Sequence, residues 1–384
     1  MPKKSLLIPG DFPPEVSGIA TYFHEIWKFY DYSENHILAA KYPKCIEFDK
    51  NSDLHTIRVG IPTGSSPLHK IIKSFIYTIK AIQLHLKNKY TVIHCGQVLS
   101  SGMTGWIIKK IFKIPYIIYV YGSETYRFGN NKYLMRMIKT FLKEAEYIIP
   151  NSRFTMDEFL PLGIPEGKFK IITPGVDVDR FHPQSLEHEL VEKYNLLGKK
   201  VLLTVARLDE RKGHDKVIEA IAAIQENNIV YLIVGKGREQ QRLQNLAKEM
   251  KIESQVIFCG YVADDDLPKY YNLCDIFLLL NRQTSVDENL IGDYEGFGIV
   301  FLEASACGKP VIAGNFGGIA DAIDDKKSGF IIDGTDLKEI IKTIKHLFKN
   351  EDICHQIGKY GRQRSVQNFT WESLSRKLIK EIGE

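Results

Sequence analysis

Two glutamates, Glu295 and Glu303, bracket an apolar segment that glycines interrupt. Gly296 and Gly298 allow a tight turn and a close approach of the backbone to a ligand. Residues 299–306 predict an amphipathic helix, whose unpaired first amides and positive dipole end suit a phosphate. If both acids were helical, their eight-residue spacing would put them on a similar face. One carboxylate is then placed to meet a hydroxyl-rich group beyond the phosphate, and the other a ribose behind it.

Two cations in the same half of the chain suit an anionic ligand. Arg207 closes a predicted strand at 201–205, and Lys212 follows five residues later, just before a helix that begins near His214. Both side chains are expected to project into one cleft, where they hold a diphosphate and stabilise the charge that develops as it leaves. The alternative role for each cation is a surface ion pair.

Strands and helices alternate along both halves of the chain, which predicts parallel sheets covered on both faces. The expected strands cover residues 4–8, 36–40, 56–60, 91–95, 115–119 and 147–150, then 201–205, 231–234, 255–258, 276–280, 311–313 and 330–332. Ligands bind beyond the carboxyl ends of such strands. The loop 121–124 follows one of these ends, and Gly18 opens a helix after a proline-rich loop, as a second candidate phosphate contact.

The length of 384 residues favours two domains over one core. A segment punctuated by proline and glycine, residues 173–183, fits an interdomain crossing. We therefore expect two domains, the first at 1–178 and the second at 179–368.

The composition indicates a globular protein of a reducing cytoplasm. Hydrophobic residues make up 44% and charged residues 26%, and the six cysteines form no C-x-x-C pair. No segment reads as a signal peptide or an apolar span of eighteen residues, so we expect neither secretion nor a transmembrane helix.

The net charge of +4 is unevenly distributed, since residues 1–178 hold 23 Lys and Arg against 15 Asp and Glu. Lysines interleave with apolar side chains in residues 68–89, 106–113 and 133–143. This pattern is typical of helices that rest on anionic lipid, and also of a solvated lysine face on core-packed helices. Nucleic acid is not an expected partner, because no groove-reading motif is present.

Taken together, these residues resemble the retaining glycosyltransferases of family four, which have the two-Rossmann-domain GT-B fold, and in particular the bacterial phosphatidylinositol mannosyltransferase branch. The resemblance covers nearly the whole chain. Its strongest carriers are the E-x7-E motif at 295–303 and the segments 304–314 and 317–319, with support from 151–155, 174–177, Arg207 with Lys212, and 369–372.

The resemblance implies a role for each predicted site residue. Glu295 contacts the hydroxyls of the donor sugar, Glu303 the ribose, and Arg207 and Lys212 the diphosphate. The predicted catalytic residues are Glu295, Arg207 and Lys212, and the predicted donor-binding set is Gly18, Tyr121, Gly122, Arg207, Lys212, Glu295, Gly296, Phe297, Gly298, Ile299 and Glu303. No metal and no cofactor is implied, the nucleoside diphosphate sugar being a co-substrate. The family also implies that the N-terminal domain at 1–178 binds the acceptor and that the C-terminal domain at 179–368 binds the nucleotide sugar. It implies further that the last helix, within 369–384, crosses back onto the first domain.

Two positions depart from the family pattern. Family members often have His-Gly-x-Glu where this chain has Tyr121, Gly122, Ser123 and Glu124, and Gly-Gly where it has Ser17 and Gly18. The histidine normally orients the donor sugar, so Tyr121 leaves that detail of donor binding open.

The resulting hypothesis is a retaining, metal-independent transfer of a hexosyl unit from a UDP- or GDP-sugar to a hydroxyl of a glycan or lipid-linked acceptor. We expect this in cell-surface polysaccharide or glycolipid synthesis, in the cytoplasm or peripherally on the inner face of the membrane. No Ser-His or Cys-His constellation suggests a protein nucleophile. The rival hypotheses are a nucleotide-sugar 2-epimerase and a catalytically silent nucleotide-sugar binding protein. The base, the sugar and the acceptor stay open, because one fold serves many chemistries.

Overall fold

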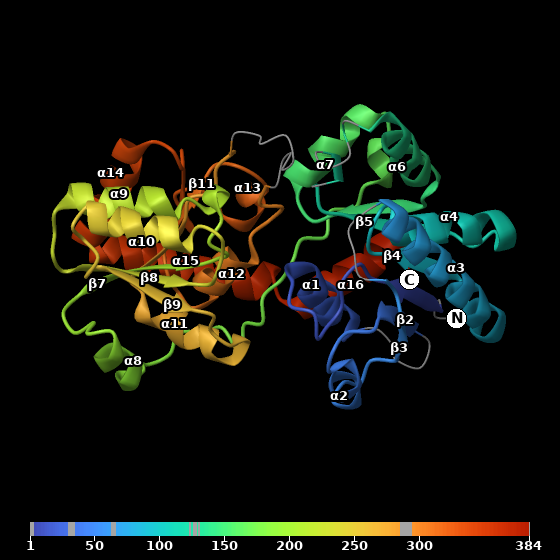
Figure 1. Ribbon diagram of the computed structural model, residues 1–384, viewed down its shortest axis with the longest axis horizontal. Coiled ribbons are helices and arrows are strands. Elements are labelled where there is room, and N and C mark those ends of the chain that lie inside the picture. Colours follow the sequence, from blue (N-terminus) through green and yellow to red (C-terminus); the bar gives the residue numbers. More distant parts are fainter. Residues whose placement is uncertain are drawn as a thin grey trace. The chain divides into compact units, whose positions relative to one another are not determined.

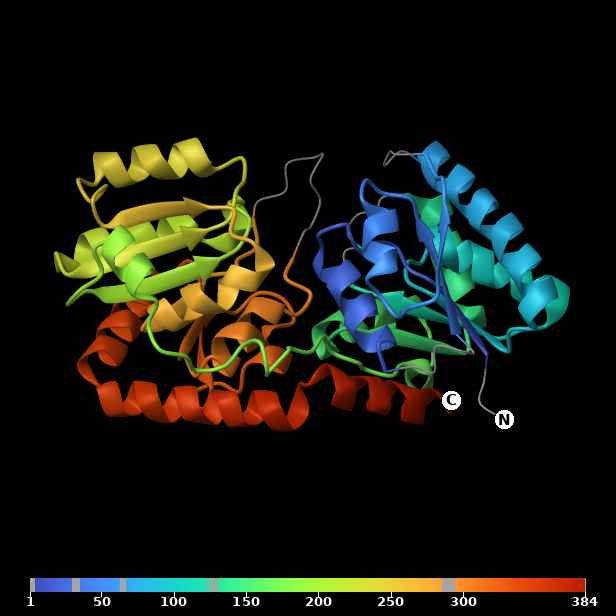
Figure 2. The same ribbon diagram turned by 90° about the horizontal axis from the view of Figure 1, so that it is seen from below.

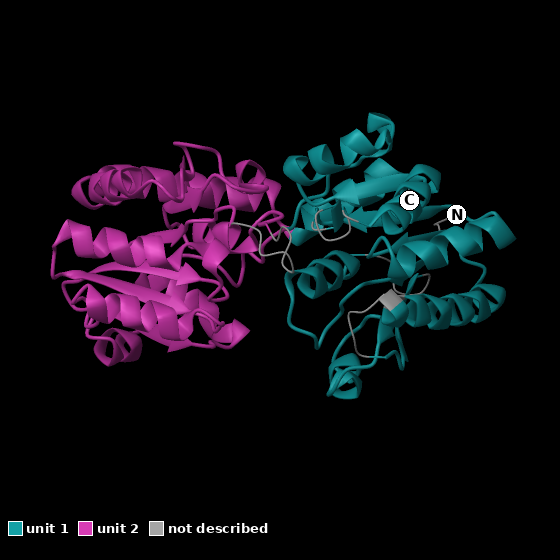
Figure 3. Ribbon diagram, turned by 45° about the horizontal axis from the view of Figure 1, so that its top comes forward, with its two compact units in different colours: residues 1–174, 371–384 teal, residues 175–370 magenta. Residues whose placement is uncertain are grey.

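A computed structural model describes residues 4–29, 35–62, 67–122, 124–125, 129, 131–284 and 294–383. The chain forms two units, which Figure 3 shows in separate colours: unit 1 is Met1–Pro174 with Trp371–Glu384, and unit 2 is Gly175–Thr370. Unit 2 therefore begins four residues before the expected boundary and ends two residues after it. Val176 explains the difference, because it pairs with Thr370 and its N–H donates to Phe369 O at 2.8 Å, which ties residues 175–178 to unit 2.

Unit 1 contains, among its described residues, a six-stranded parallel sheet in the order β3-β2-β1-β4-β5-β6. The strands β2, β3, β4 and β5 are labelled in Figure 1. The strands are β1 (Ser5–Ile8), β2 (Asn35–Ala40), β3 (Thr56–Val59), β4 (Val92–Cys95), β5 (Tyr116–Val120) and β6 (Tyr147–Pro150). One apolar cluster joins the sheet to α3 (Pro67–Asn88), α4 (Ser100–Phe112), α6 (Lys132–Glu144) and α7 (Arg153–Phe159). A second cluster joins it to α1 (Gly18–Trp27), α2 (Cys45–Lys50) and α16 (Trp371–Ile382). Short 3-10 helices at Leu160–Leu162 and Glu166–Lys168 follow α7.

Unit 2 repeats this plan in the order β12-β11-β10-β7-β8-β9. Its strands are β7 (Lys200–Val205), β8 (Ile229–Val234), β9 (Val256–Gly260), β10 (Ile276–Leu279), β11 (Val311–Gly314) and β12 (Gly329–Ile332). One cluster contains α9 (His214–Ile224), α10 (Gln240–Glu249), α14 (Leu337–Lys349) and α15 (Glu351–Asn368), and the other α11 (Leu267–Leu273), α12 (Ile299–Ala306) and α13 (Ile319–Ala322). The remaining helices among the described residues of unit 2 are α8 (His188–Lys193) and the 3-10 turns Glu210–Lys212 and Asp264–Asp266.

Both sheets have the doubly wound order 3-2-1-4-5-6 when strands are numbered within their own unit. Central strands such as β8 are buried at every residue, as expected for a parallel sheet covered on both faces. In such sheets ligands bind outside the carboxyl ends, where the strand order reverses. In unit 2 this switch point lies between β7 and β10.

The last helix, α16, belongs to unit 1 (Figure 2). Its Trp371 ring packs edge-on to Tyr22 with centroids 6.2 Å apart, and Leu378 and Ile382 are buried in the same cluster. Ser375 Oγ donates to Ile26 O at 3.0 Å. The prediction that the C-terminal helix returns to the first domain is confirmed. In the part of the chain that is described, no helix is both long and apolar enough to cross a bilayer.

Candidate active site

The segment that carries Glu295 is shaped by two glycines in the left-handed region. Gly298 has a φ of 88° and precedes α12, which begins at Ile299 without a side-chain cap. Gly317 has a φ of 107°, and a Cβ there would lie 2.2 Å from Glu295 O, so only glycine allows the pairing of Glu295 with Gly317. The bounds expected for this helix, 299–306, are confirmed.

One condition of that prediction is not met, and one detail of it is wrong. Glu295 lies outside the helix, so the argument that an eight-residue spacing puts both glutamates on one helical face does not apply. The helix is not amphipathic either, because Phe301, Leu302 and Ala304 are all buried and Glu303 is largely covered. The core of unit 2 surrounds this helix instead of touching one stripe.

Lys212 and Glu295 form an ion pair at the carboxyl edge of the unit 2 sheet. Lys212 Nζ donates to Glu295 Oε2, and Arg211 Nη1 lies 3.6 Å from the same oxygen. Burial alone raises the pKa of Glu295, but the charges of Lys212 and Arg211 outweigh it and hold that pKa below its usual range. Burial lowers the pKa of the Lys212 ammonium, which the Glu295 carboxylate partly offsets. The pair brings a carboxylate and two cations to one point.

Arg207 lies in a different environment from Lys212. Its side chain is 65% exposed, against 9% for that of Lys212, and its Nη2 lies 3.2 Å from Asp209 Oδ2. Arg207 O is near His214 Nε2, at 3.3 Å. The structure thus gathers Lys212, Glu295 and Arg211 closely, with Arg207 at the exposed side of the same turn. Arg211 was missed in the sequence, although it is next to Lys212.

A second buried ion pair, also missed, holds this turn. Arg282 donates both guanidinium arms to Asp215, with distances of 2.9 Å from Nη1 to Oδ1 and 2.8 Å from Nη2 to Oδ2. Burial raises the pKa of Asp215, yet Arg282 outweighs it and lowers the pKa overall. No signal in the sequence links these residues, since 67 positions separate them.

Glu303 is a buried carboxylate with one close partner. Tyr271 Oη donates to Glu303 Oε2 at 2.6 Å. Burial raises the pKa of Glu303 to about 7, although the Tyr271 hydrogen bond and the charge of Arg180 act in the opposite direction. A group that titrates near neutrality and accepts hydrogen bonds can bind the hydroxyls of a ribose.

Three predicted donor contacts belong to unit 1. Gly18 is the first residue of α1, and Ser17 caps this helix by accepting from Ala20 N at 3.1 Å, which gives Ser17 a role of its own. Tyr121 packs against the apolar cluster that joins the unit 1 sheet to α1, α2 and α16, and its hydroxyl is buried. Gly122 has a φ of 93°, and Ser123 lies outside the described residues.

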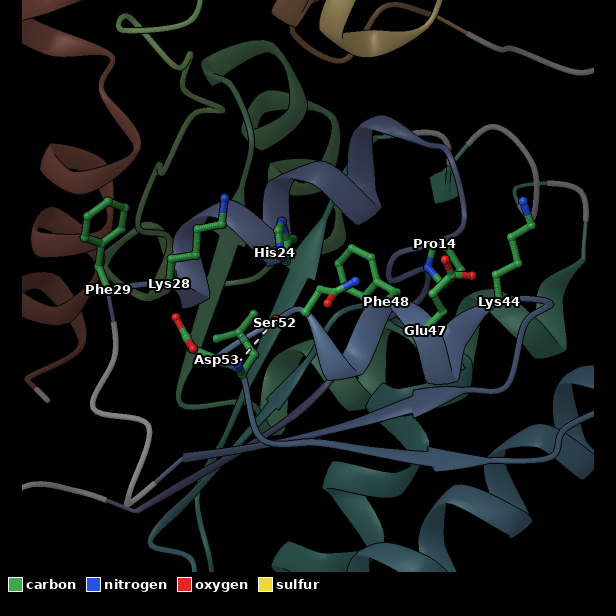
Figure 4. Close-up of a pocket in the computed structure, with 11 residues that line it drawn as sticks. Pro14, His24, Lys28, Phe29, Lys44, Glu47, Phe48, Ser52 and Asp53 are labelled. Atoms are coloured by element: carbon green, nitrogen blue, oxygen red, sulfur yellow. Dashed lines mark hydrogen bonds between the residues drawn. The ribbon is translucent and has the colours of Figure 1, made fainter.

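A pocket of about 720 Å³ lies in unit 1 beside α1 and α2 (Figure 4). Lysine, acidic and aromatic side chains line it, and the rings of His24 and Phe48 meet edge to face at 5.3 Å. None of the predicted site residues lines this pocket. It is distinct from the cation and carboxylate site of unit 2.

Two family descriptions match consecutive parts of the chain. "Glycosyltransferase Family 4" matches residues 16–180, and "Glycosyl transferases group 1" matches residues 187–364. The chain is 26% identical to the GDP-mannose-dependent alpha-(1-6)-phosphatidylinositol monomannoside mannosyltransferase of Mycolicibacterium smegmatis, over 98% of both chains. It is also 26% identical to the GDP-mannose-dependent monoacylated alpha-(1-6)-phosphatidylinositol monomannoside mannosyltransferase of Corynebacterium glutamicum, over 98% of this chain and 97% of the other.

A solved structure has the same fold over the whole chain. The complex of Anabaena HepE with UDP matches with a TM-score of 0.83 and 18% identity, over 99% of both chains. The two doubly wound units therefore have the architecture of the GT-B glycosyltransferases. Within that class, the chain belongs to glycosyltransferase family 4.

Proposed function

We propose that this protein transfers a hexosyl unit, with retention and without a metal ion, from a nucleoside diphosphate sugar to a hydroxyl of a glycan or lipid-linked acceptor. The observation that carries the proposal is the Lys212–Glu295 pair with Arg211 beside it, at the switch point of the unit 2 sheet. A site that combines fixed cations with a carboxylate suits a ligand with both phosphates and hydroxyls.

The roles of the groups follow from their charges. Lys212, Arg211 and the uncapped start of α12 face the negative charge that grows on the diphosphate as the anomeric C–O bond breaks. Glu295 accepts hydrogen bonds from sugar hydroxyls. The acceptor oxygen bonds to the anomeric carbon on the face that the diphosphate leaves, and its proton passes to the departing phosphate oxygen. No protein nucleophile takes part in this scheme.

The relatives favour particular substrates for the first assays. Both full-length mannosyltransferases described above are named as GDP-mannose-dependent and as acting on phosphatidylinositol mannosides. We therefore propose GDP-mannose as donor and a lipid-linked glycan as acceptor, with UDP-sugars as the second set to test.

We further propose that unit 1 contacts an anionic membrane through α3. This helix packs on α4 through small polar side chains, since Ser74 Oγ donates to Ser100 O at 2.9 Å and Thr78 Oγ1 to Thr104 Oγ1 at 3.1 Å. The same helix buries Tyr77 and Ala81 in the unit 1 core, but other large apolar side chains point outward, and Leu68 and Phe75 are both 64% exposed. Such an outward apolar face is typical of a membrane-contacting helix.

The arrangement of charges along α3 supports the same surface. At about 100° per residue, Leu68, Phe75, Ile79 and Leu86 fall within about 40° of one another, and Lys73, Lys80 and Lys87 form a second row centred about 120° around the helix from that stripe. Apolar insertion beside a lysine row suits anionic headgroups. The segment at 106–113 contributes less, because Trp106 packs near the Phe141 ring at 5.8 Å and Lys110 pairs with Glu144.

A donor screen followed by product analysis tests the function. A ligand at a hundred times its dissociation constant stabilises the protein by about 2.7 kcal/mol, so a thermal-shift screen of GDP, UDP and their sugars identifies the donor. That donor is then incubated with and without a lipid-linked acceptor. An α-linked product that appears only with acceptor supports the transferase, whereas rearranged donor without acceptor supports an epimerase. Binding without any turnover supports a sensor.

A further inference from the structure

We propose that Asp215 and Arg282 act as a positioning pair. The pair fixes the turn that carries Lys212, so that the Lys212 ammonium meets the β-phosphate of the donor, the phosphate bonded to the sugar. The inference rests on the proposed function, since it concerns how the same site holds a diphosphate. It adds two residues that do not themselves touch the ligand.

Three contacts fasten this turn to the end of β10. Arg282 N–H donates to Arg211 O at 3.0 Å, and the Arg282 guanidinium holds Asp215 on the first turn of α9 through two parallel hydrogen bonds. Gly213, with a φ of 70°, packs so tightly that a Cβ there would lie 2.3 Å from Leu280 O. The backbone on both sides of Lys212 is therefore fixed to β10.

The Asp215–Arg282 contact has the geometry of a positioning element. Both side chains are only 10% exposed, and a bidentate pair fixes direction as well as distance. Two further groups approach the pair, Glu210 at 3.8 Å from Arg282 and Arg242 at 3.8 Å from Asp215, and both distances are too long for a directed bond. A buried ion pair contributes little net stability, so a positional role accounts better for its presence.

Loss of the Asp215–Arg282 pair should affect only the binding of the β-phosphate. β7 and β10 flank the switch point, and the pair joins the loop after one strand to the end of the other. If that link is loosened, the Lys212 ammonium is no longer held at one place. Binding of the β-phosphate weakens, while the rest of the nucleotide keeps its contacts.

The test compares nucleotide pairs by calorimetry. GDP and GMP are measured first and UDP and UMP second, on wild type, Lys212→Met, Arg282→Lys, Arg282→Met and the double variant Lys212→Met with Arg282→Met. We expect wild type to bind the diphosphate at least ten-fold more tightly than the monophosphate. Lys212→Met and Arg282→Met should lose most of this preference, while their affinity for the monophosphate stays unchanged. The double variant loses nothing further. Arg282→Lys keeps the charge but cannot form both bonds, so it recovers only part of the preference.

Arg242→Ala is the matched control, because it removes another cation near Asp215 without breaking the bidentate pair, and it should keep the wild-type preference. Equal loss of monophosphate and diphosphate affinity in Arg282→Met, or additive losses in the double variant, would show a merely structural role and overturn the proposal. If Lys212→Met itself keeps the diphosphate preference, the proposed phosphate site fails. If Lys212→Met loses the diphosphate preference but Arg282→Met and Arg282→Lys keep it, the positioning role of Asp215 and Arg282 fails and the phosphate site at Lys212 stands.

Discussion

Lys212 and Glu295, 83 residues apart in the chain, share a hydrogen bond at the carboxyl edge of the unit 2 sheet. Replacing Glu295 with Ala should remove most turnover, because its partner in the complex is the sugar. GDP or UDP affinity should stay within a few fold, since the diphosphate contacts remain. Steady-state kinetics and calorimetry on the same preparation check this. An equal loss of diphosphate affinity would assign Glu295 to the phosphates instead.

The same pair predicts a coupling in stability. Glu295→Gln leaves the Lys212 charge buried beside Arg211 without a counter-charge, which should cost about 3–5 kcal/mol of unfolding free energy. Adding Lys212→Met should restore most of that loss. Urea denaturation of both single variants and the double variant completes the cycle. Additive losses would mean that the two charges do not interact in solution.

The cations should act mainly in the transition state. A charge-assisted contact contributes about 1.5–3 kcal/mol, and the charge on the leaving diphosphate grows as the bond breaks. Arg207→Ala and Lys212→Ala should therefore lower kcat more than they raise the donor Kd, with only partial rescue by Arg207→Lys. The matched control is Arg238→Ala, which removes an exposed cation near the same Asp209. Unchanged kcat in both alanine variants would make the pair structural.

Glu303 predicts a pH dependence of stability. Its pKa rises from an ordinary value near 4.5 to about 7 in the folded protein, so the folded state holds the extra proton within that window. The stability that comes from this raised pKa is fully present below pH 4.5 and is lost as the pH rises to 7. The loss is at most about 3 kcal/mol of unfolding free energy. The glutamine of Glu303→Gln cannot titrate. The free energy of unfolding of this variant, measured relative to that of wild type, should therefore be higher at pH 8 than at pH 5. Urea denaturation at both pH values measures the difference.

Glu303 should also make nucleotide binding pH-dependent. Ribose hydroxyls donate to the ionised carboxylate, so wild-type affinity for GDP or UDP should increase between pH 6 and pH 8. In Glu303→Gln this increase should be absent. Calorimetry across this range decides the matter, and a parallel slope in both proteins would remove Glu303 from the ribose site.

Metal removal should leave activity largely intact, because Lys212, Arg211 and the amides of α12 supply positive charge at the diphosphate. Assays with and without EDTA test this. Loss of activity that Mn²⁺ or Mg²⁺ restores would contradict the metal-independent scheme.

Membrane binding should depend on the outward face of α3. Leu68→Ser with Phe75→Ser should abolish sedimentation with phosphatidylglycerol-containing vesicles, and Lys73→Gln with Lys80→Gln should remove its salt dependence. Leu197→Ser, which changes an exposed leucine of unit 2, is the control. If wild type sediments with neither neutral nor anionic vesicles, the α3 face has another function.

The fold was predictable because it depends on local patterns. Every predicted strand is present, and no bound shifts by more than two residues: β8 begins at Ile229 instead of 231, and β9 ends at Gly260 instead of 258. Continuous apolar runs and the glycines around α12 carry this information along the chain. The alternation of strands and helices also predicts that both sheets are parallel and covered on both faces.

The partners within the site were less predictable. Residue types such as Lys212 and Glu295 were found, but their contact depends on Gly317 letting the backbone of Glu295 pass close by. Arg282 and Asp215 read as ordinary charges in the sequence, and Tyr271 as an ordinary aromatic residue. Only tertiary packing brings them to Arg211 and Glu303.

The return of α16 also has a consequence for how the protein is made. A ribosome synthesises residues 1–174 before unit 2, but Trp371, Leu378 and Ile382, which complete the apolar cluster around Tyr22, emerge only after unit 2. Unit 2 is continuous and can fold during translation, whereas unit 1 must wait with an open apolar surface. A nonsense mutation within the codons for α16 would therefore damage unit 1, most of which precedes unit 2 in the chain, and chaperones should associate with nascent unit 1 for longer than with unit 2.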